Sequence, residues 1–217
     1  MRVNISNAVS YIERNGAVLA FPIQGKESLP SLWSCFYPRS KMNWDWSESG
    51  DNRVAEIWHL RAALSDSRKV IYSKWYQGRA TFFSKTTFTA LLSVSAQDPK
   101  LPHSLATESR ALLEVLEDDS PLPTKRLKAA ADLFGKENEA RFQRALRELW
   151  RKFLIVGYGE VEEGGFPSLA IGATRLLFED VWEEARELTV AKRMHIFEKY
   201  FPPASAFGRF LLRSQKR

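Results

Sequence analysis

Apolar residues recur at helical spacing in the second half of the chain, over 101–175. The pattern predicts a helix over 105–116, a short helix that begins at Thr124, and a long amphipathic helix after the turn at Gly135. The apolar face of the long helix consists of Phe142, Ala145, Leu146, Leu149, Trp150 and Phe153. At about 100° per residue, three arginines point away from that face: Arg144, Arg147 and Arg151.

Two strand-like segments, 154–162 and 166–174, follow the long helix. The turn Glu163-Gly164-Gly165 joins them, and its glycines supply the positive φ that a tight hairpin needs. The order of helix, short helix, amphipathic helix and hairpin is that of a winged helix-turn-helix. A helix that presents arginines beside a hairpin is a common device for binding a DNA duplex.

The arginine face also has a simpler interpretation. Arginines on the outer face of an amphipathic helix usually contact only solvent, and Glu137, Glu139 and Glu148 are close enough in sequence to pair with them. Many winged helices bind proteins or serve as scaffolding. The pattern therefore predicts the fold of this segment and leaves its partner open.

The N-terminal half follows the same order. The expected elements are a helix ending at Asn15, a strand over 17–23, a helix over 30–37 with Pro30 in its first turn, a helix over 54–64, a hairpin of 69–75 and 79–83, and a helix over 86–94. An irregular insertion, 38–52, interrupts this order. We predict a mostly helical α+β fold of two tandem winged helix-turn-helix modules, with small β-hairpins and a C-terminal helical tail.

A proline-containing linker at 96–102 separates the two modules, since it has no periodicity. One more amphipathic helix is expected over 178–188. The predicted organisation is an N-terminal module over 1–97, a second module over 98–190, and a basic tail over 191–217.

The net charge of +6 is distributed unevenly over these regions. Residues 1–101 carry +5, residues 102–190 carry −5, and residues 191–217 carry +6. An anionic partner would be attracted first to the N-terminal module and the tail. The acidic second module could instead dock a protein partner.

The composition excludes several classes of protein. Hydrophobic residues make up 44% of the chain, which is enough for a folded core. No apolar run reaches the roughly 18 residues that cross a bilayer, and the first ten residues lack the apolar segment of a secretory signal. Cys35 is the only cysteine, so no internal disulfide forms, which fits the cytoplasm. Because there are also only three histidines, we expect no metal site and no cofactor.

Aromatic residues in the N-terminal module offer surfaces for stacking. Trp44 and Trp46 lie in the polar insertion, where they either stack on unpaired bases or fold back onto the core. The predicted hairpin places Lys74 and Trp75 just before its turn and Tyr76 within it. A wing of this type often follows a phosphate backbone or enters a minor groove. The alternative is an ordinary turn between two strands with charged ends.

Three segments carry a family resemblance: Arg14-Asn15-Gly16 with Leu19-Ala20-Phe21-Pro22-Ile23, Leu29-Pro30-Ser31-Leu32-Trp33, and Val70-Ile71-Tyr72-Ser73-Lys74-Trp75-Tyr76-Gln77-Gly78-Arg79-Ala80-Thr81. They resemble the small bacterial proteins related to AlkZ, the winged-helix DNA glycosylases. The resemblance implies a role in DNA repair. Glycosylases of this kind are larger, stack several winged helices around a duplex, and excise alkylated or cross-linked bases.

The active glycosylases carry a glutamine, a hydrophobic residue, and then a glutamine or aspartate that positions the attacking water. None of the five glutamines of this chain has such neighbours. Gln24 lies nearest the expected place, but Gly25 and Lys26 follow it, and a charged lysine cannot accept a proton from water. Gln24 is therefore only a weak catalytic candidate, and we predict no glycosylase activity.

The leading prediction is a cytoplasmic protein of two winged-helix modules that binds duplex or damaged DNA without sequence-specific control. The residues expected to contact DNA are Arg61, Arg68, Lys74, Trp75, Tyr76, Arg79, Arg144, Arg147 and Arg151, with further attraction from Arg209, Arg213, Lys216 and Arg217 in the tail. One alternative is a DNA glycosylase that acts on alkylated bases. The other is a winged-helix module that binds protein, with Trp44 and Trp46 as anchors.

Overall fold

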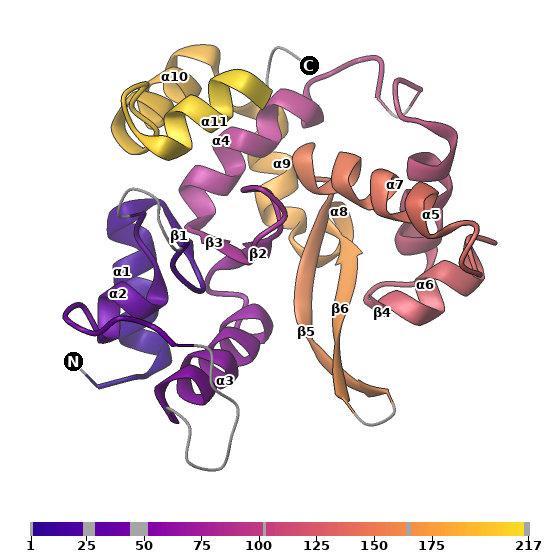
Figure 1. Ribbon diagram of the computed structural model, residues 1–217. Coiled ribbons are helices and arrows are strands. Elements are labelled where there is room, and N and C mark those ends of the chain that lie inside the picture. Colours follow the sequence, from indigo (N-terminus) through magenta and orange to yellow (C-terminus); the bar gives the residue numbers. More distant parts are fainter. Residues whose placement is uncertain (1, 24–28, 44–51, 102, 164–165, 215–217) are drawn as a thin grey trace.

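A computed structural model describes residues 2–23, 29–43, 52–101, 103–163 and 166–214 (Figure 1). The first half consists of α1 (Ile5–Asn15), β1 (Ala17–Leu19), α2 (Leu32–Phe36), α3 (Asn52–Asp66), β2 (Ile71–Ser73), β3 (Thr81–Phe83) and α4 (Lys85–Ala96). The second half consists of α5 (Thr107–Asp118), β4 (Leu122–Pro123), α6 (Thr124–Ala130), α7 (Glu139–Arg151), β5 (Ile155–Glu163) and β6 (Phe166–Ala173). The chain then continues through α8 (Thr174–Leu177), α9 (Glu179–Glu187), α10 (Val190–Tyr200) and α11 (Ala206–Ser214).

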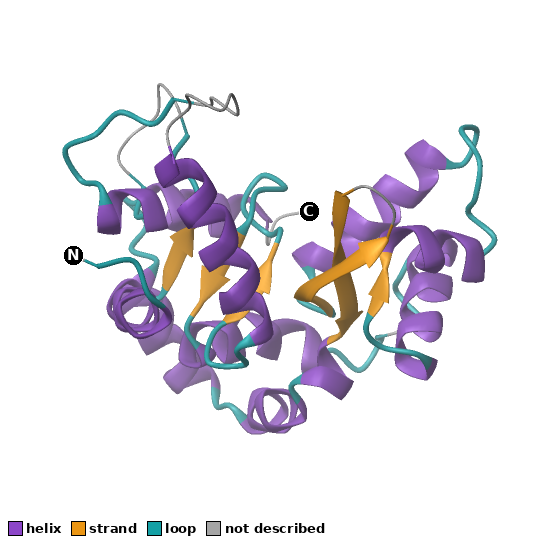
Figure 2. Cartoon of the chain, turned by 90° about the horizontal axis from the view of Figure 1, so that it is seen from below, coloured by secondary structure: helices purple, strands orange, loops and turns teal. Residues whose placement is uncertain are grey.

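The strands form one six-stranded antiparallel sheet in the order β1-β3-β2-β5-β6-β4. Each half contributes three strands. From the outer edge to the joint, the order is β1, β3, β2 in the first half and β4, β6, β5 in the second, so that the two halves meet through β2 and β5. Figure 2 shows the two groups of strands at the centre with helices on the outside. The fold is therefore mixed α+β. Strands from both sides of the linker that the sequence predicts belong to the same sheet.

The junction between the halves depends on a glycine. β2 pairs with β5 at a single position, Tyr72 opposite Gly157. A Cβ atom added at Gly157 would overlap the Tyr72 ring. That ring also contacts Phe82 and Trp150 edge-on, with centroid distances of 5.3 and 6.5 Å. The absence of a side chain at position 157 thus lets an aromatic residue of the first half pack across the joint.

Three hydrophobic clusters lie around the sheet. One fills the space between α1, α2, α3 and one face of the first-half strands, and a second packs α5, α6 and α7 against β5 and β6. The third covers the other face of the first-half strands, and it includes residues of α4, α9, α10 and α11. The C-terminal helices therefore return to cover the first half of the sheet.

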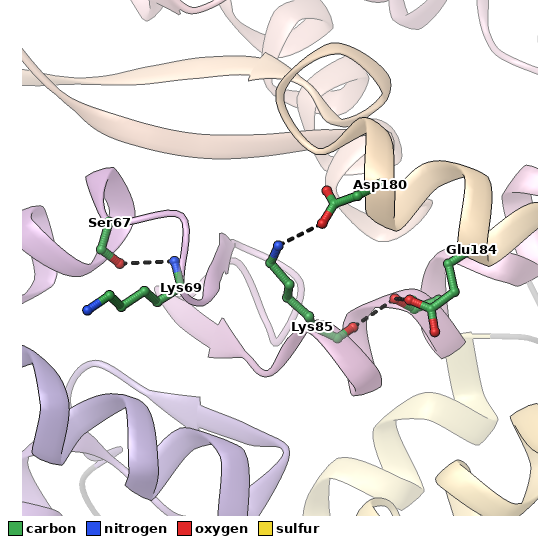
Figure 3. Close-up of polar contacts among 6 residues, drawn as sticks. Ser67, Lys69, Lys85, Asp180 and Glu184 are labelled. Atoms are coloured by element: carbon green, nitrogen blue, oxygen red, sulfur yellow. Dashed lines mark hydrogen bonds and ion pairs between the residues drawn. The ribbon is translucent and has the colours of Figure 1, made fainter.

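Polar contacts help to attach α9 to α4 (Figure 3). The Lys85 ammonium donates to the Asp180 carboxylate at 2.7 Å, and the Thr89 hydroxyl lies 3.5 Å from the Glu184 carboxylate. The hydrogen bond from Lys85 holds the pKa of Asp180 below its ordinary value. Both side chains of this ion pair are substantially exposed, so they add little to the packing of the apolar core between the helices.

The predicted order of elements is confirmed, with several corrections to detail. The first hairpin is shorter than expected, with three-residue strands. Pro30 precedes α2 instead of lying in its first turn. The N-cap of this helix is Ser31, whose hydroxyl accepts a hydrogen bond from the Ser34 N–H group. The short strand β4 was not predicted. The predicted insertion at 38–52 lies partly outside the described residues, as do Trp44 and Trp46.

Phe153 was wrongly placed on the apolar face of the long helix. The helix α7 ends at Arg151, and Phe153 adopts a left-handed backbone conformation with φ of 59°. Its side chain consequently turns away from the second-half core and packs with Trp75, Phe83 and Phe88, at centroid distances of 5.9, 5.9 and 5.3 Å. The residue thus joins the end of α7 to the core of the first half.

Candidate nucleic-acid interface

A groove lies where α7, α4, α11 and the turn after β2 come together. It consists of two adjoining hollows of about 540 and 490 Å³ that share Trp75, Arg147, Arg151 and Ser214 in their walls. Six cationic residues line it: Lys74, Arg144, Arg147, Arg151, Lys152 and Arg213. Glu148 is the acidic residue among the lining residues that the structure describes. We call this feature the basic groove.

The glutamates near α7 are occupied by partners other than its groove-facing arginines. Glu148 accepts hydrogen bonds from the Ser109 hydroxyl at 2.5 Å and from the Ala106 N–H at 3.2 Å. Glu139 pairs with the Lys128 ammonium at 2.5 Å. These contacts tie α7 to α5 and α6, although the Glu148 side chain also borders the larger hollow.

The arginines of that face are exposed and available. Within the described ranges, Arg147 and Arg151 form no ion pair, and Arg141 is the α7 arginine that does, with its guanidinium 2.8 Å from the Glu108 carboxylate. Of the two interpretations of the arginine face, mutual pairing with the helix's own glutamates is therefore wrong for Arg147 and Arg151. Unpaired guanidinium groups side by side bind anionic oxygens well.

The turn after β2 brings Lys74 into the groove. Gln77 and Gly78 both have positive φ, at 53° and 72°, which turns the chain back toward β3. Lys74 is half-buried where the strand ends. Burial lowers the pKa of its ammonium group, and the nearby charge of Arg61 lowers it further.

The helix α11 forms one wall of the groove and covers the aromatic residues of the turn. Phe207 and Phe210 pack on Tyr76, each with a centroid distance of 4.9 Å, and Phe210 lies edge-on against Trp75 at 4.9 Å. This packing fixes the direction of the helix and places Arg213 in the groove wall. The predicted tail is therefore helical and packed against the body of the protein over its described residues.

Several residues expected to contact DNA lie elsewhere. Arg61 is only 7% exposed and pairs with Glu160 of β5, while its guanidinium lies 4.1 Å from the centre of the Trp58 ring. Trp75 and Tyr76 are each 3% exposed and belong to the core beneath α11. Side chains so deeply buried have other partners than a phosphate or a base in this structure.

The remaining candidates are more scattered. Arg68 donates to the Tyr158 hydroxyl at 2.7 Å and lies before β2, at the end opposite Lys74. Arg79 is exposed on the turn next to the groove but does not line it. Gln24, Lys216 and Arg217 lie outside the described residues. The structure therefore brings together Lys74, Arg144, Arg147 and Arg151 from the predicted set, and adds Arg213 from the tail.

Lys152 and the α4 side of the groove were not predicted. Lys152 directly follows α7, where the helical pattern ends, and Leu91, Val94 and Ser95 come from a helix that the sequence shows only as a closing element. The one available signal was the run Arg151-Lys152, which continues the positive charge of α7.

The described residues contain no cluster of three or more histidine, cysteine or carboxylate side chains that would hold a metal ion. No helix among the same described residues has the length and apolar character needed to span a membrane.

The fold and the groove define an α+β protein with a six-stranded antiparallel sheet and a positively charged groove at the joint of its two halves. The chain belongs to the AlkZ-related family, whose sequence model matches residues 3–203. The resemblance seen in the N-terminal segments is thereby confirmed, and membership links the chain to DNA repair. No curated protein and no solved structure matches the chain.

Proposed function

We propose that this protein binds duplex or damaged DNA through the basic groove and acts in DNA repair. The observation that carries the proposal is the convergence of six cationic side chains, contributed by the turn after β2, by α7 and the residue after it, and by α11. Charges that are far apart in sequence thus form one positive surface, which includes the arginines of α7. Such a surface matches the closely spaced phosphates of a nucleic acid.

The fold supports the use of α7 as a recognition helix. Each half has the order helix, strand, helix, helix, hairpin, and a three-stranded sheet in which the first strand pairs with the third. This arrangement is what two winged-helix modules joined edge to edge would have. In a winged helix the helix before the hairpin enters the major groove, and α7 is that helix in the second half.

The proposed contacts have different roles. The α7 side chains that approach the major groove of the duplex are Arg144, Arg147 and Arg151. Phosphates on the other side of the major groove are neutralised by Lys74 and Arg213. Neighbouring backbone phosphates come within reach of Arg79 on the exposed turn. Arg61 and the two aromatic residues of the turn hold the scaffold in place and take no part in binding.

Binding to a plain duplex should weaken steeply with salt. If each of the six groove cations displaces one counterion, the affinity falls by roughly 10³-fold between about 50 and 200 mM salt, because the slope of log affinity against log salt is about −0.9 per contact. Fluorescence anisotropy with a labelled duplex across this range measures the slope. The absence of binding at about 50 mM salt, where such contacts are strongest, would contradict the proposal and favour a protein partner for the acidic second module.

Base release from alkylated DNA is expected to stay at the level of the control without protein. No glutamine of the chain has the neighbours that position an attacking water, so binding is not followed by excision. The measurement is incubation with methylated duplex DNA followed by cleavage of abasic sites with alkali. Abasic sites above the control that disappear in Gln24→Ala would instead identify the protein as a glycosylase.

A further inference from the structure

Lys74 combines three properties that phosphate binding alone does not require. Its side chain is half-buried, it lines the smaller hollow of the basic groove, and it shares that hollow with Arg147, Arg151 and Arg213. The hollow thus contains one primary amine among guanidinium groups. Guanidinium groups hold phosphates but do not act as nucleophiles at neutral pH, because they remain protonated.

The environment of Lys74 makes its ammonium group give up a proton more readily than an exposed lysine does. The two causes already described, burial and the charge of Arg61, both lower the pKa of Lys74. A lysine desolvated beside another cation is the arrangement in which the amine becomes a nucleophile toward carbonyl carbon. Lys74 therefore differs in chemistry from the arginines around it.

Lys74 lines this hollow together with Gly78 of the turn. A Cβ atom added at Gly78, on the turn above the hollow, would meet no atom within 4 Å. Three arginines at the edge of the hollow can hold the phosphates on either side of one nucleotide. A nucleotide that reaches the amine must expose an electrophilic carbon, and in DNA an abasic site does so, since its sugar opens to an aldehyde.

We propose that Lys74 forms a Schiff base with the aldehyde of an abasic site held in the basic groove. The inference rests on the proposed DNA binding and names the substrate class of the same site. Arg147, Arg151 and Arg213 position the flanking phosphates, and Lys74 provides the reacting nitrogen.

The reaction balances without any further reagent. The Lys74 amine attacks C1′ of the open sugar, a C–N bond forms, and the carbonyl oxygen leaves as water with the two amine protons. A proton from the solvent then gives the protonated imine. The imine acidifies C2′, whose proton passes to water, and the electron pair expels the 3′ phosphate as the C3′–O bond breaks. Hydrolysis of the imine then returns the free amine and leaves a nicked strand.

The experiment is reductive trapping. The full chain is incubated with a duplex that carries one abasic site in the presence of sodium borohydride, which delivers hydride to the imine carbon and makes the adduct permanent. We expect a covalent protein–DNA band, and peptide mass spectrometry should place the adduct on Lys74. A duplex with a tetrahydrofuran analogue has no aldehyde and should give no band.

The matched variant is Lys74→Arg, which keeps the positive charge for phosphate binding but cannot form an imine. It should lose the adduct in trapping reactions run at a protein concentration that an anisotropy titration of the variant shows to saturate the duplex. Lys100→Arg, a change at an exposed lysine that does not line the groove, should keep the adduct. Duplex binding with no adduct, or an adduct on another amine, would overturn the inference and leave the proposed function standing. Loss of all binding by the wild type would overturn both.

Discussion

Replacing Arg147 and Arg151 together with alanine is expected to weaken duplex binding roughly 60-fold at about 0.1 M salt, since two phosphate contacts carry about 1.8 logarithmic units there. Both arginines line the two hollows of the basic groove, and neither forms an ion pair within the described part of the chain. The slope of log affinity against log salt should fall in magnitude by about 1.8. Anisotropy titrations of the variant and the wild type at several salt concentrations measure both quantities.

Arg141→Ala is the matched control on the same helix. Arg141 is bonded to the Glu108 carboxylate of α5 and does not line the groove. Its removal should therefore change the affinity less than threefold, about 0.7 kcal/mol, and leave the slope unaltered. An equal loss in the control and the double variant would show that the affinity depends on overall charge and not on the basic groove. Both variants alter surface residues, so circular dichroism should show little change in thermal stability.

Phe153→Ala is expected to lower the free energy of unfolding by about 3–5 kcal/mol, because removing a buried phenylalanine loses its transfer energy and leaves a cavity. Phe153 is 3% exposed and packs against rings of the turn after β2, β3 and α4. The side chain also connects α7 to the first-half core. Urea denaturation followed by tryptophan fluorescence measures the change, and the midpoint of thermal unfolding should fall by roughly 10 °C.

Phe134→Ala provides the comparison for this variant, because Phe134 is 71% exposed. The same chemical change at that position should alter the free energy of unfolding by less than about 0.5 kcal/mol. If Phe153→Ala proved no more destabilising than Phe134→Ala, the attachment of α7 to the first-half core would not depend on this ring.

The sequence alone predicted the local elements and the face that α7 presents. Helical spacing identified five of its buried residues, and the same spacing directed Arg144, Arg147 and Arg151 outward. Such features depend on neighbours within a few residues along the chain, so periodicity reports them. The same local signals placed the Lys74 turn and its glycine, and the resemblance to the AlkZ-related family was visible in short segments.

The net charge of each region did not indicate the position of the basic groove. The second module has a net charge of −5, and the charge distribution therefore predicted that an anion binds to the N-terminal module and the tail. In the structure the carboxylates of Glu148 and Glu139 contact α5 and α6, while Arg147 and Arg151 line the basic groove with the turn after β2 and α11. A net charge says nothing about which side of a helix a charge occupies, and the side decides what the charge can bind.

Tertiary packing decided the rest. Arg61 lies on the same helical face as Val54, Ile57 and Leu64, and the approach of β5 buries it against Glu160. Trp75 and Tyr76 are buried because α11 returns over 100 residues later to cover them. The basic groove itself exists only because the two halves share a sheet through Tyr72 and Gly157. Contacts between residues so far apart leave no periodic trace in the sequence, and they determine which predicted side chains meet.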